Sequence, residues 1–287
     1  MSARGRAHRR ALGVELAIHL ALWVAVIFAL YPVLWVVAQA LSSGDAPAGR
    51  IIPWPVSPSL EHFEAVVLRQ HEGTWLFFLQ LINSLLVSVA TAMVAILIAT
   101  PAAYALSRFE FVGARGATRT LLATQMFPGV AAAIPLYLLL DASGLLDTRS
   151  GLVLVYATSA VPFAIFQLRG AFDAIPRDLE EAAMVDGATR LGAFVRVVLP
   201  AARPALAVTG LFAFMTAWNE FILAATFLTS QDLYTLPILL NGYASEYDSN
   251  FGHFAAGAIV VSIPVMALFY ALQRQLVGGL TSGGVKG

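Results

Sequence analysis

The chain has 287 residues, of which 59% are hydrophobic and only 12% are charged, and its mean hydropathy is +0.78. Soluble domains are about 45–50% apolar with about a quarter of their residues charged, so this composition excludes a soluble globular fold. The sequence contains no cysteine, which excludes a disulfide scaffold, a thiolate nucleophile and a cysteine-ligated metal centre. The formal net charge is zero, so charge is informative only through its distribution along the chain.

The apolar residues gather in six long runs, each with at most one charged residue. In chain order the runs are Leu16–Leu41, Thr74–Ser107, Thr120–Leu140, Ser150–Leu168, Pro204–Gln231 and Ser249–Gln273. About 20 apolar residues cross a hydrocarbon core of about 30 Å, and lipid offers the backbone no hydrogen-bond partners. Each run is therefore predicted to be a membrane-spanning helix, and part of the overlong Thr74–Ser107 is expected to lie along or beyond the interface. Most runs contain a proline, which membrane helices tolerate.

The basic residues are divided unequally between the two sides of the membrane. Of the 17 Lys and Arg residues, 14 lie in the two terminal tails and in the connections after the second and fourth runs. The positive-inside rule then predicts that both termini are cytoplasmic. The first run is too long for a signal peptide and is expected to be retained. We expect a cytoplasmic tail over 1–15, one transmembrane domain over 16–287, and an external loop over 42–73 with at most a short helix near Leu60–Leu68.

The connection over 173–203 is the least membrane-like part of the chain. From Arg169 to Arg203, five arginines are balanced by five acidic residues. Apolar residues recur at the helical spacings of three and four, at Met184, Ala188, Leu191, Val195 and Val198. The segment is therefore predicted to be helical with one apolar stripe.

Turn and cap residues divide this segment into two short helices. Pro176 and the acids after it favour a helix start, and Gly187 favours its end. Thr189 suits the cap of a second helix, which Pro200 is expected to stop. One interpretation is an amphipathic linker on the lipid headgroups, but such helices cluster Lys and Arg on the polar face. Balanced charge and short side chains favour the other interpretation, a surface on which another protein docks.

A motif within this segment resembles a known family. The segment reads Glu181-Ala182-Ala183-Met184-Val185-Asp186-Gly187-Ala188, followed by Phe194 and then by Val197-Val198-Leu199-Pro200. This is similar to the EAA loop of membrane subunits in binding-protein-dependent ABC importers, with Val197 in place of the usual isoleucine. Six spans, a long outer loop, Ala217–Phe221 and the ending 279–287 also resemble the smaller permease of the maltose or trehalose type. The resemblance covers essentially the whole chain.

The resemblance implies the type I ABC importer permease fold, an all-α membrane protein of six transmembrane helices with a coupling loop over 173–203. In that family the loop sits in a cleft of the ATPase subunit, where Glu181 would accept hydrogen bonds from a basic group. The implied contact residues are Glu181, Ala182, Ala183, Asp186, Gly187, Ala188, Leu199 and Pro200. A second implied ATPase contact is in the C-terminal tail over 278–287, at Gly283, Gly284, Val285 and Lys286.

The resemblance also implies the partners and the setting. We expect a second permease subunit, two copies of an ABC ATPase subunit and an extracytoplasmic sugar-binding protein, in the lipid of a bacterial cytoplasmic membrane and without nucleic acid. The chain has no phosphate-binding loop, so ATP and Mg are expected on the ATPase and no cofactor on this chain. No metal-binding pattern is present among its five scattered histidines.

Glu220 is the one carboxylate deep inside an apolar run, about 24 Å along a helix from Pro204. An ionisable group at that depth is a functional-site hypothesis by default. One interpretation places Asn219 and Glu220 on the translocation path or its outer gate. The other is a hydrogen-bonded pair between helices that never contacts solute.

Three other classes of protein remain to be weighed against an ABC sugar permease. A secondary transporter or channel would need coupling carboxylates or inverted repeats in the spans, and neither is evident. A membrane-embedded enzyme would need paired ionisable groups at one depth, which are also not evident. An ABC permease for phosphate, peptides, amino acids or polyamines is disfavoured by the tail and by Trp218–Phe221. Nothing in the sequence chooses between maltose or maltodextrin, trehalose and another oligosaccharide.

Overall fold

The computed structural model describes residues 3–44, 51–55, 57–71, 73–127, 129–244 and 250–283, with side chains described from Val14 onward except at 274 and 276–283. The chain divides into two compact units. The first comprises Met1–Arg69 with Leu240–Val260, and the second comprises Gln70–Leu239 with Val261–Gly287. Each unit is described by itself.

The first unit contains α1 (Ala3–Ala40), α2 (Glu61–Val67) and the beginning of α13 (Phe251–Gly283). Helix α1 starts at Ala3, so the predicted N-terminal tail is helical and continuous with the first span. Ala40 of α1 packs with Ala255 and Ala256 of α13. None of the most apolar part of α1 is buried within the chain, so its surface is available to lipid or to another subunit.

The loop over 42–73, predicted to be external, has more local structure than its sequence indicated. The short helix expected near Leu60–Leu68 is confirmed as α2. Glu61 accepts hydrogen bonds from the Gly44 amide and the Ser43 hydroxyl, and these hold the pKa of its carboxyl below the ordinary value. A hairpin of β1 (Gln70–His71) and β2 (Thr74–Trp75) follows. The sequence did not predict it, because strands of two residues are too short to show an alternating pattern of apolar and polar residues.

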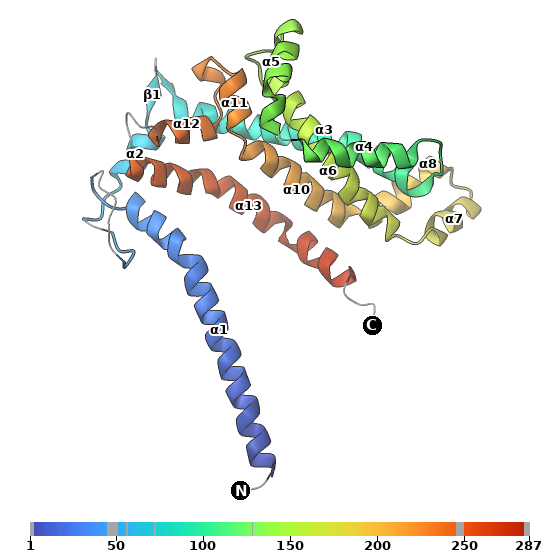
Figure 1. Cartoon of the computed structure of the whole chain (residues 1–287), viewed down its shortest axis with the longest axis horizontal. Helices are drawn as coiled ribbons and strands as arrows, with labels where there is room; N and C mark the ends of the chain where they lie inside the picture. Colours follow the sequence, from blue (N-terminus) through green and yellow to red (C-terminus); the bar gives the residue numbers. More distant parts are fainter. Residues whose placement is uncertain are drawn as a thin grey trace. The chain divides into compact units, whose positions relative to one another are not determined.

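Three helices form the centre of the second unit. Helices α3 (Leu76–Arg108), α6 (Arg149–Asp173) and α10 (Arg203–Trp218) pack pairwise and run side by side in Figure 1. Small side chains let them approach closely, as where Ala95, Ala160 and Ala213 meet. Helix α3 has 33 residues and is therefore about 50 Å long, which exceeds a hydrocarbon core of about 30 Å.

The third apolar run is not one helix, and that prediction was wrong. It forms α4 (Ala114–Met126), the 3₁₀ turn η1 (Gly129–Ala132) and α5 (Ala133–Ala142), with a bend of 96°. Phe127 has an extended backbone, with φ −83° and ψ 127°. A residue before proline is pushed out of the helical region, and the next residue is Pro128.

The fifth run also divides, contrary to the single helix predicted over Pro204–Gln231. Helix α10 ends at Trp218, and α11 (Ile222–Phe227) begins after a break of three residues. A 3₁₀ turn, η3 (Gln231–Leu233), and α12 (Leu236–Tyr243) follow. By length and composition, four described helices can cross a membrane, or up to six if each bent pair is one span. Six is therefore the upper count within the described ranges.

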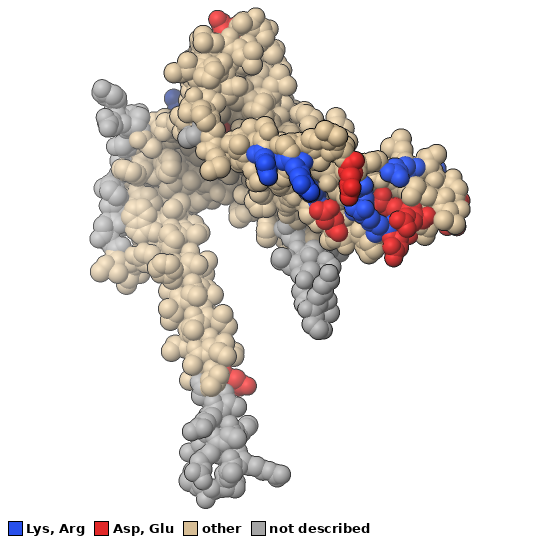
Figure 2. Space-filling model, turned by 45° about the vertical axis from the view of Figure 1, so that its right-hand side comes forward, with Lys and Arg blue, Asp and Glu red and all other residues tan. Residues whose placement is uncertain are grey.

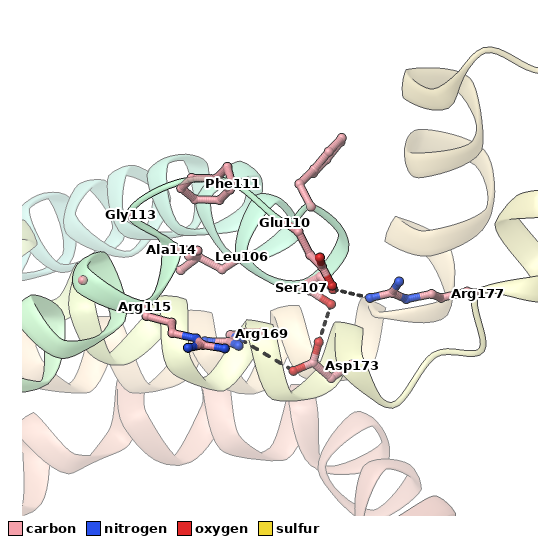
Figure 3. A pocket seen from close by; sticks show the side chains of 12 residues that line it. Leu106, Ser107, Glu110, Phe111, Gly113, Ala114, Arg115, Arg169, Asp173 and Arg177 are labelled. Atoms are coloured by element: carbon pink, nitrogen blue, oxygen red, sulfur yellow. Dashed lines mark hydrogen bonds and ion pairs between the residues drawn. The ribbon is translucent and has the colours of Figure 1, made fainter.

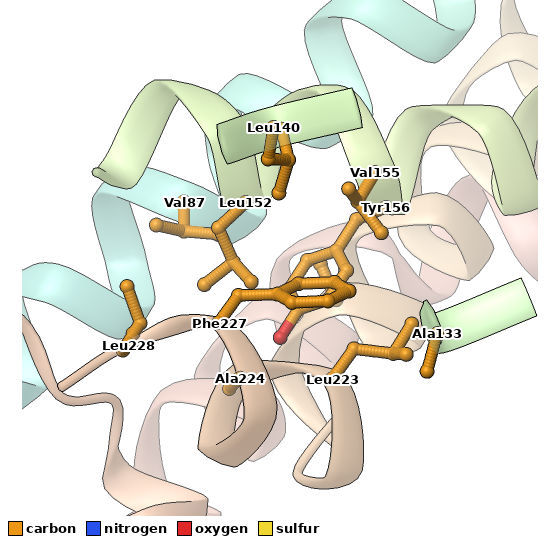
Figure 4. Packing of buried hydrophobic residues seen from close by; sticks show 11 residues of the cluster. Val87, Ala133, Leu140, Leu152, Val155, Tyr156, Leu223, Ala224, Phe227 and Leu228 are labelled. Carbon is orange, nitrogen blue, oxygen red and sulfur yellow. The ribbon is translucent and has the colours of Figure 1, made fainter. Parts of the chain in front are cut away.

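A hydrophobic cluster joins α6 to the elements around the break in the fifth run. Leu152, Val155 and Tyr156 of α6 pack with Phe227 of α11 and with Leu140 of α5. Figure 4 shows Leu152 and Tyr156 pointing toward the Phe227 ring. Because this cluster buries one face of both broken segments, α5 and α11 are held against α6 without being continuous spans.

Candidate functional site

The predicted pair of short helices on the charged segment is confirmed. Helix α7 (Asp178–Val185) is followed by Gly187, whose φ of +93° is a conformation that favours glycine. The Thr189 side chain then caps α8 (Arg190–Ala193) by accepting from the Gly192 amide at 3.1 Å. The turn and the cap lie where the sequence placed them.

The second helix runs one residue past the predicted stop at Pro200 and ends before the fifth span begins. The chain continues from α8 through a π-helical turn, η2 (Phe194–Val198), and α9 (Leu199–Ala201), and it bends by 74° only at Ala202. Proline has no N–H and clashes with the carbonyl four residues before it. The chain accommodates Pro200 by widening the helix, so that the Leu199 amide donates to the Phe194 carbonyl five residues back.

Glu180 fastens α7 to α3. Its side chain is 8% exposed and forms an ion pair with Arg108, which is 6% exposed. The Tyr104 hydroxyl donates to the same carboxylate at 2.8 Å. A buried carboxylate that satisfies two partners from another helix fixes the position and rotation of the short α7.

Further hydrogen bonds join the ends of α3, α6 and α7. Arg108 donates to the Ile175 carbonyl at 2.9 Å, and Arg177 donates to the Ser107 carbonyl at 3.1 Å. The Ser107 hydroxyl donates to Asp173, which also lies 3.7 Å from the Nε of Arg169 (Figure 3). The connection from α6 to α7 is therefore tied at three points to the end of α3.

An aromatic cluster packs next to this hydrogen-bond network. The Tyr104 and Phe194 rings lie 4.2 Å apart between centroids, and Phe172 contacts both rings edge-on. The Arg190 guanidinium lies over the Phe109 ring at 5.1 Å. The part of the segment after the glycine turn thus packs on these rings, and the part before it is linked to them by the hydrogen bond between Tyr104 and Glu180.

The outer face of the segment carries the residues that the motif singled out. Glu181, Ala182, Asp186 and Gly187 are exposed, and Ala183, Ala188, Leu199 and Pro200 are partly buried. Large apolar side chains are exposed beside them: Leu179, Val185, Leu191 and Val195. Figure 2 shows most of the charged side chains on its face gathered at the end where α7 and α8 lie. Exposed apolar side chains among charges are typical of a protein interface.

The predicted apolar stripe is only partly buried. Val198 is buried, whereas Leu191 and Val195 are exposed. The turn at Gly187 changes the direction of the chain, so one helical period does not run through both helices. Sequence reasoning also missed Glu180, because two adjacent glutamates give no sign of which one faces the protein.

Glu220 lies at the break between α10 and α11. Its carboxylate accepts from the amides of Leu223 at 2.9 Å and Ala224 at 3.0 Å, which caps the start of α11. The Tyr156 hydroxyl of α6 donates to it at 2.7 Å. Asn219 is exposed. The Glu220 carboxylate thus connects α6 to α11, whereas the Asn219 side chain is exposed.

A cavity of about 580 Å³ lies beside this break, between α4, η1, α5, α6 and α11. Its polar lining comprises Thr124, Gln125, Thr158 and Ser159, and Phe127 supplies an aromatic face. Pro162 of α6, which also lines the cavity, has no N–H to donate to the Thr158 carbonyl four residues before it. Polar groups at membrane depth are expensive unless they face a water-filled space.

The tail residues predicted to contact the ATPase fall mainly outside the described residues. Gly283 is the last residue of α13, and Gly284, Val285 and Lys286 lie beyond the described range. Within the described residues, no three His, Asp or Glu side chains gather as a metal site would require.

Asp147 ties the α5–α6 connection to the segment after α11. It accepts from the Thr229 amide at 2.8 Å, the Ser230 amide at 3.2 Å and the Ser230 hydroxyl. Partial burial would raise the pKa of Asp147, but these hydrogen bonds outweigh it and hold the pKa at about 2. The Asp147 carboxylate therefore makes its full contribution to the free energy of unfolding above the pKa of about 4 that it has in the unfolded chain. This contribution is lost as the pH falls toward 2. In thermal unfolding, Asp147→Asn should lower the Tm at pH 7, and its difference from wild type should shrink below pH 4.

Asp141→Asn is the matched control, because the exposed Asp141 side chain makes no hydrogen bond or ion pair within the described residues. Its Tm should follow that of the wild type at every pH. An Asp147→Asn difference that is constant from pH 7 to pH 3 would contradict the assigned role of the carboxylate.

The chain is similar to known transport proteins over most of its length. Residues 93–281 match the family described as binding-protein-dependent transport system inner membrane component. The chain is 37% identical over 263 residues to the trehalose transport system permease protein SugB of Mycobacterium tuberculosis, covering 91% of this chain and 93% of that one. It is 33% identical over 290 residues to the maltose/maltodextrin transport system permease protein MalG of Vibrio parahaemolyticus, covering 94% and 95%.

A solved structure is similar over the same extent. It is a bacterial ABC transporter involved in the import of the acidic polysaccharide alginate, with a TM-score of 0.75 and 26% identity, covering 96% of this chain and 98% of that one. The family match covers more than half of the chain, and the relatives are similar over nearly their whole length. The chain therefore belongs to the inner-membrane permease components of binding-protein-dependent ABC transport systems and has their all-α, type I importer fold.

Proposed function

We propose that this chain is one of two different permease subunits of an ATP-driven importer for a maltose- or trehalose-like oligosaccharide. The trehalose and maltose/maltodextrin permeases to which it is similar support a sugar as the solute. A solute-binding protein outside the cytoplasmic membrane delivers the sugar. ATP and Mg bind to two copies of a separate ATPase subunit, and this chain translocates the solute without reacting with it.

The α7 segment is the site at which the ATPase acts on this chain. The observation that carries this is the division of labour between adjacent glutamates: Glu180 is buried against Arg108, and Glu181 is exposed. A docking helix must present one face to a partner while its other face is fixed to the spans that it moves. Glu181 accepts charge-assisted hydrogen bonds from the ATPase, and the C-terminal tail adds a second contact.

The α7 segment and both termini face the cytoplasm in this proposal. The basic residues of the second and fourth connections support it, because Arg108, Arg177 and Arg190 lie together at the α7 end. Asp147 and the loop before α3 then face the binding protein.

The solute passes the cavity beside the break in the fifth run. Hydroxyl and amide groups with one aromatic face suit an uncharged, hydroxyl-rich ligand. Asn219 lies on the path near this cavity, and Glu220 shapes the outer gate by holding α11 to Tyr156.

Uptake in cells tests the function. The chain is co-expressed with its binding protein, second permease and ATPase, and uptake of labelled trehalose, maltose, phosphate and amino acids is measured. We expect uptake of an oligosaccharide that depends on the ATPase and is lost in Glu181→Lys, whereas Glu15→Lys at the exposed N-terminal end of α1 leaves it unchanged. Uptake only of an ionic solute, or uptake that persists without the ATPase, would refute the proposal.

The role of Glu220 has its own test. Glu220→Gln keeps an acceptor for Tyr156 but weakens the cap of α11, since a neutral acceptor is about half as strong as a charged one. We expect uptake to fall severalfold with binding-protein affinity unchanged, and Tyr156→Phe to have a similar effect. If Glu220→Gln leaves both uptake and basal ATPase activity of the complex unchanged, Glu220 is a structural link alone.

A further inference from the structure

A second large cavity lies at the α7 end of the second unit, and the proposed transport function assigns no ligand to it. Its volume is about 610 Å³. The end of α3, the α3–α4 connection, the first turn of α4 and the end of α6 enclose it, with Arg177 at its edge (Figure 3). Three arginines line it, from three different elements: Arg115, Arg169 and Arg177.

The basic residues that line this cavity outnumber the acidic ones. Asp173 and Glu110 are its only acidic lining residues. Asp173 is already engaged by the Ser107 hydroxyl and by Arg169. Arg115 is exposed and forms no hydrogen bond, ion pair or ring contact within the described residues. The lining thus has one positive charge more than its negative charges, and Arg115 is free to bind.

The start of α4 adds to this positive potential. Helix α4 has 13 residues, and its first turn lines the cavity. Gly113 precedes it with φ +100°, no side chain caps the helix, and no acidic residue lies in its first turn. A helix N-terminus favours an anion, yet here Arg115 is placed at it. The uncapped amides and the arginines around the cavity together favour a bound anion.

The cavity is lined largely by polar and charged residues, and exposed apolar side chains beside it form an apolar rim. In the α3–α4 connection, Phe111 is 47% exposed and Val112 fully exposed. Along α4, Leu122 and Met126 are also exposed, and no residue of α4 is buried. Exposed apolar side chains next to arginines are typical of the membrane–water interface, where basic pockets between helices hold anionic headgroups.

We propose that this cavity binds the phosphate headgroup of an anionic phospholipid, such as phosphatidylglycerol. Arg115 and Arg177 contact the phosphate together with the backbone amides of Arg115 and Gly116, since the Ala114 amide already donates to the Phe111 carbonyl, and the acyl chains lie along the exposed apolar side of α4. The apolar rim favours a lipid over a free phosphate, because a soluble anion would gain nothing from Phe111 and Val112. The binding does not depend on which solute is transported.

The test uses the full-length chain purified with its transporter subunits in nanodiscs. The probes are phosphatidylglycerol, phosphatidylcholine of equal chain length and glycerol phosphate, with retained lipid measured by native mass spectrometry. The wild type should prefer phosphatidylglycerol to phosphatidylcholine by about tenfold, and Arg115→Ala should reduce that preference by about fivefold, the effect of one interfacial arginine at about 1 kcal/mol. Arg115→Ala should still assemble, because Arg115 supports no contact within the described residues.

Arg119→Ala is the matched control, since Arg119 lies one turn further along α4 and does not line the cavity. It should retain phosphatidylglycerol like the wild type. Equal losses in Arg119→Ala and Arg115→Ala would overturn the proposal, because they would reveal only a general surface potential. Glycerol phosphate that competes as well as the lipid would also overturn it, because the site would then hold a small anion.

Discussion

Replacing Glu180 by alanine is expected to lower the Tm of the purified chain by on the order of 10 °C. The change leaves the Arg108 guanidinium buried without its carboxylate, and removing one partner of a buried ion pair costs about 3–5 kcal/mol. A kcal/mol shifts the Tm of a chain near this size by roughly 2–4 °C. Thermal unfolding followed by size-exclusion chromatography of wild type and variant measures the shift.

Glu181→Ala is the matched control for this experiment. It removes the neighbouring glutamate from the same helix, but Glu181 is exposed and forms no ion pair within the described residues, so its Tm should change by less than about 2 °C. If Glu181 contacts the ATPase as proposed, the two variants should also differ in function, because Glu181→Ala should then weaken ATPase binding while the fold persists. Equal Tm values for Glu180→Ala and wild type would mean that the Arg108 pair does not hold α7.

The contacts around Glu180 connect α7 to both α3 and α6. Helix α7 is joined to α3 through Tyr104 and Arg108, and to α6 through the short connection at Ile175. The segment after Gly187 joins the same aromatic cluster through Phe194. A displacement imposed on α7 therefore reaches the ends of α3 and α6 together, which is what a rigid coupling element requires.

The local features of this segment could be predicted from sequence because each depends on a few adjacent residues. Gly187 takes a backbone conformation that favours glycine, and Thr189 caps the helix that begins one residue later. Neither needs any partner from elsewhere in the chain. The short helix α2 was predictable for the same reason.

The features that could not be predicted depend on contacts between distant segments. Glu180 differs from Glu181 only in facing Arg108, which is 72 residues away. The tolerance of Pro200 could not be read from its sequence neighbours, because a π-helical turn absorbs the proline and moves the break to Ala202. The polar cavity needs Gln125 and Ser159 to converge from α4 and α6. Hydropathy alone treats such broken runs as single helices.

Substitutions at Gly187 distinguish an effect on the fold from an effect on the docking of the ATPase. A Cβ at this position would meet nothing within 4 Å in the chain, so a side chain there costs only the backbone strain of a positive φ, about 1–2 kcal/mol. Gly187→Ala and Gly187→Trp should therefore be folded and inserted to similar extents. If the ATPase covers this turn, Gly187→Trp should lower uptake and ATPase co-purification by more than tenfold, since about 1.4 kcal/mol of lost contact already gives that factor.

The matched control is Gly144→Trp. Gly144 also has a positive φ, +68°, and a Cβ there would also meet nothing within 4 Å, but it lies in the α5–α6 connection away from α7. Both tryptophan variants carry the same kind of strain, so both should lower the Tm by a few degrees. Only Gly187→Trp should lose the ATPase. Normal co-purification of an active ATPase with Gly187→Trp would show that the coupling partner does not seat on this turn, whereas equal loss in both variants would trace the effect to backbone strain.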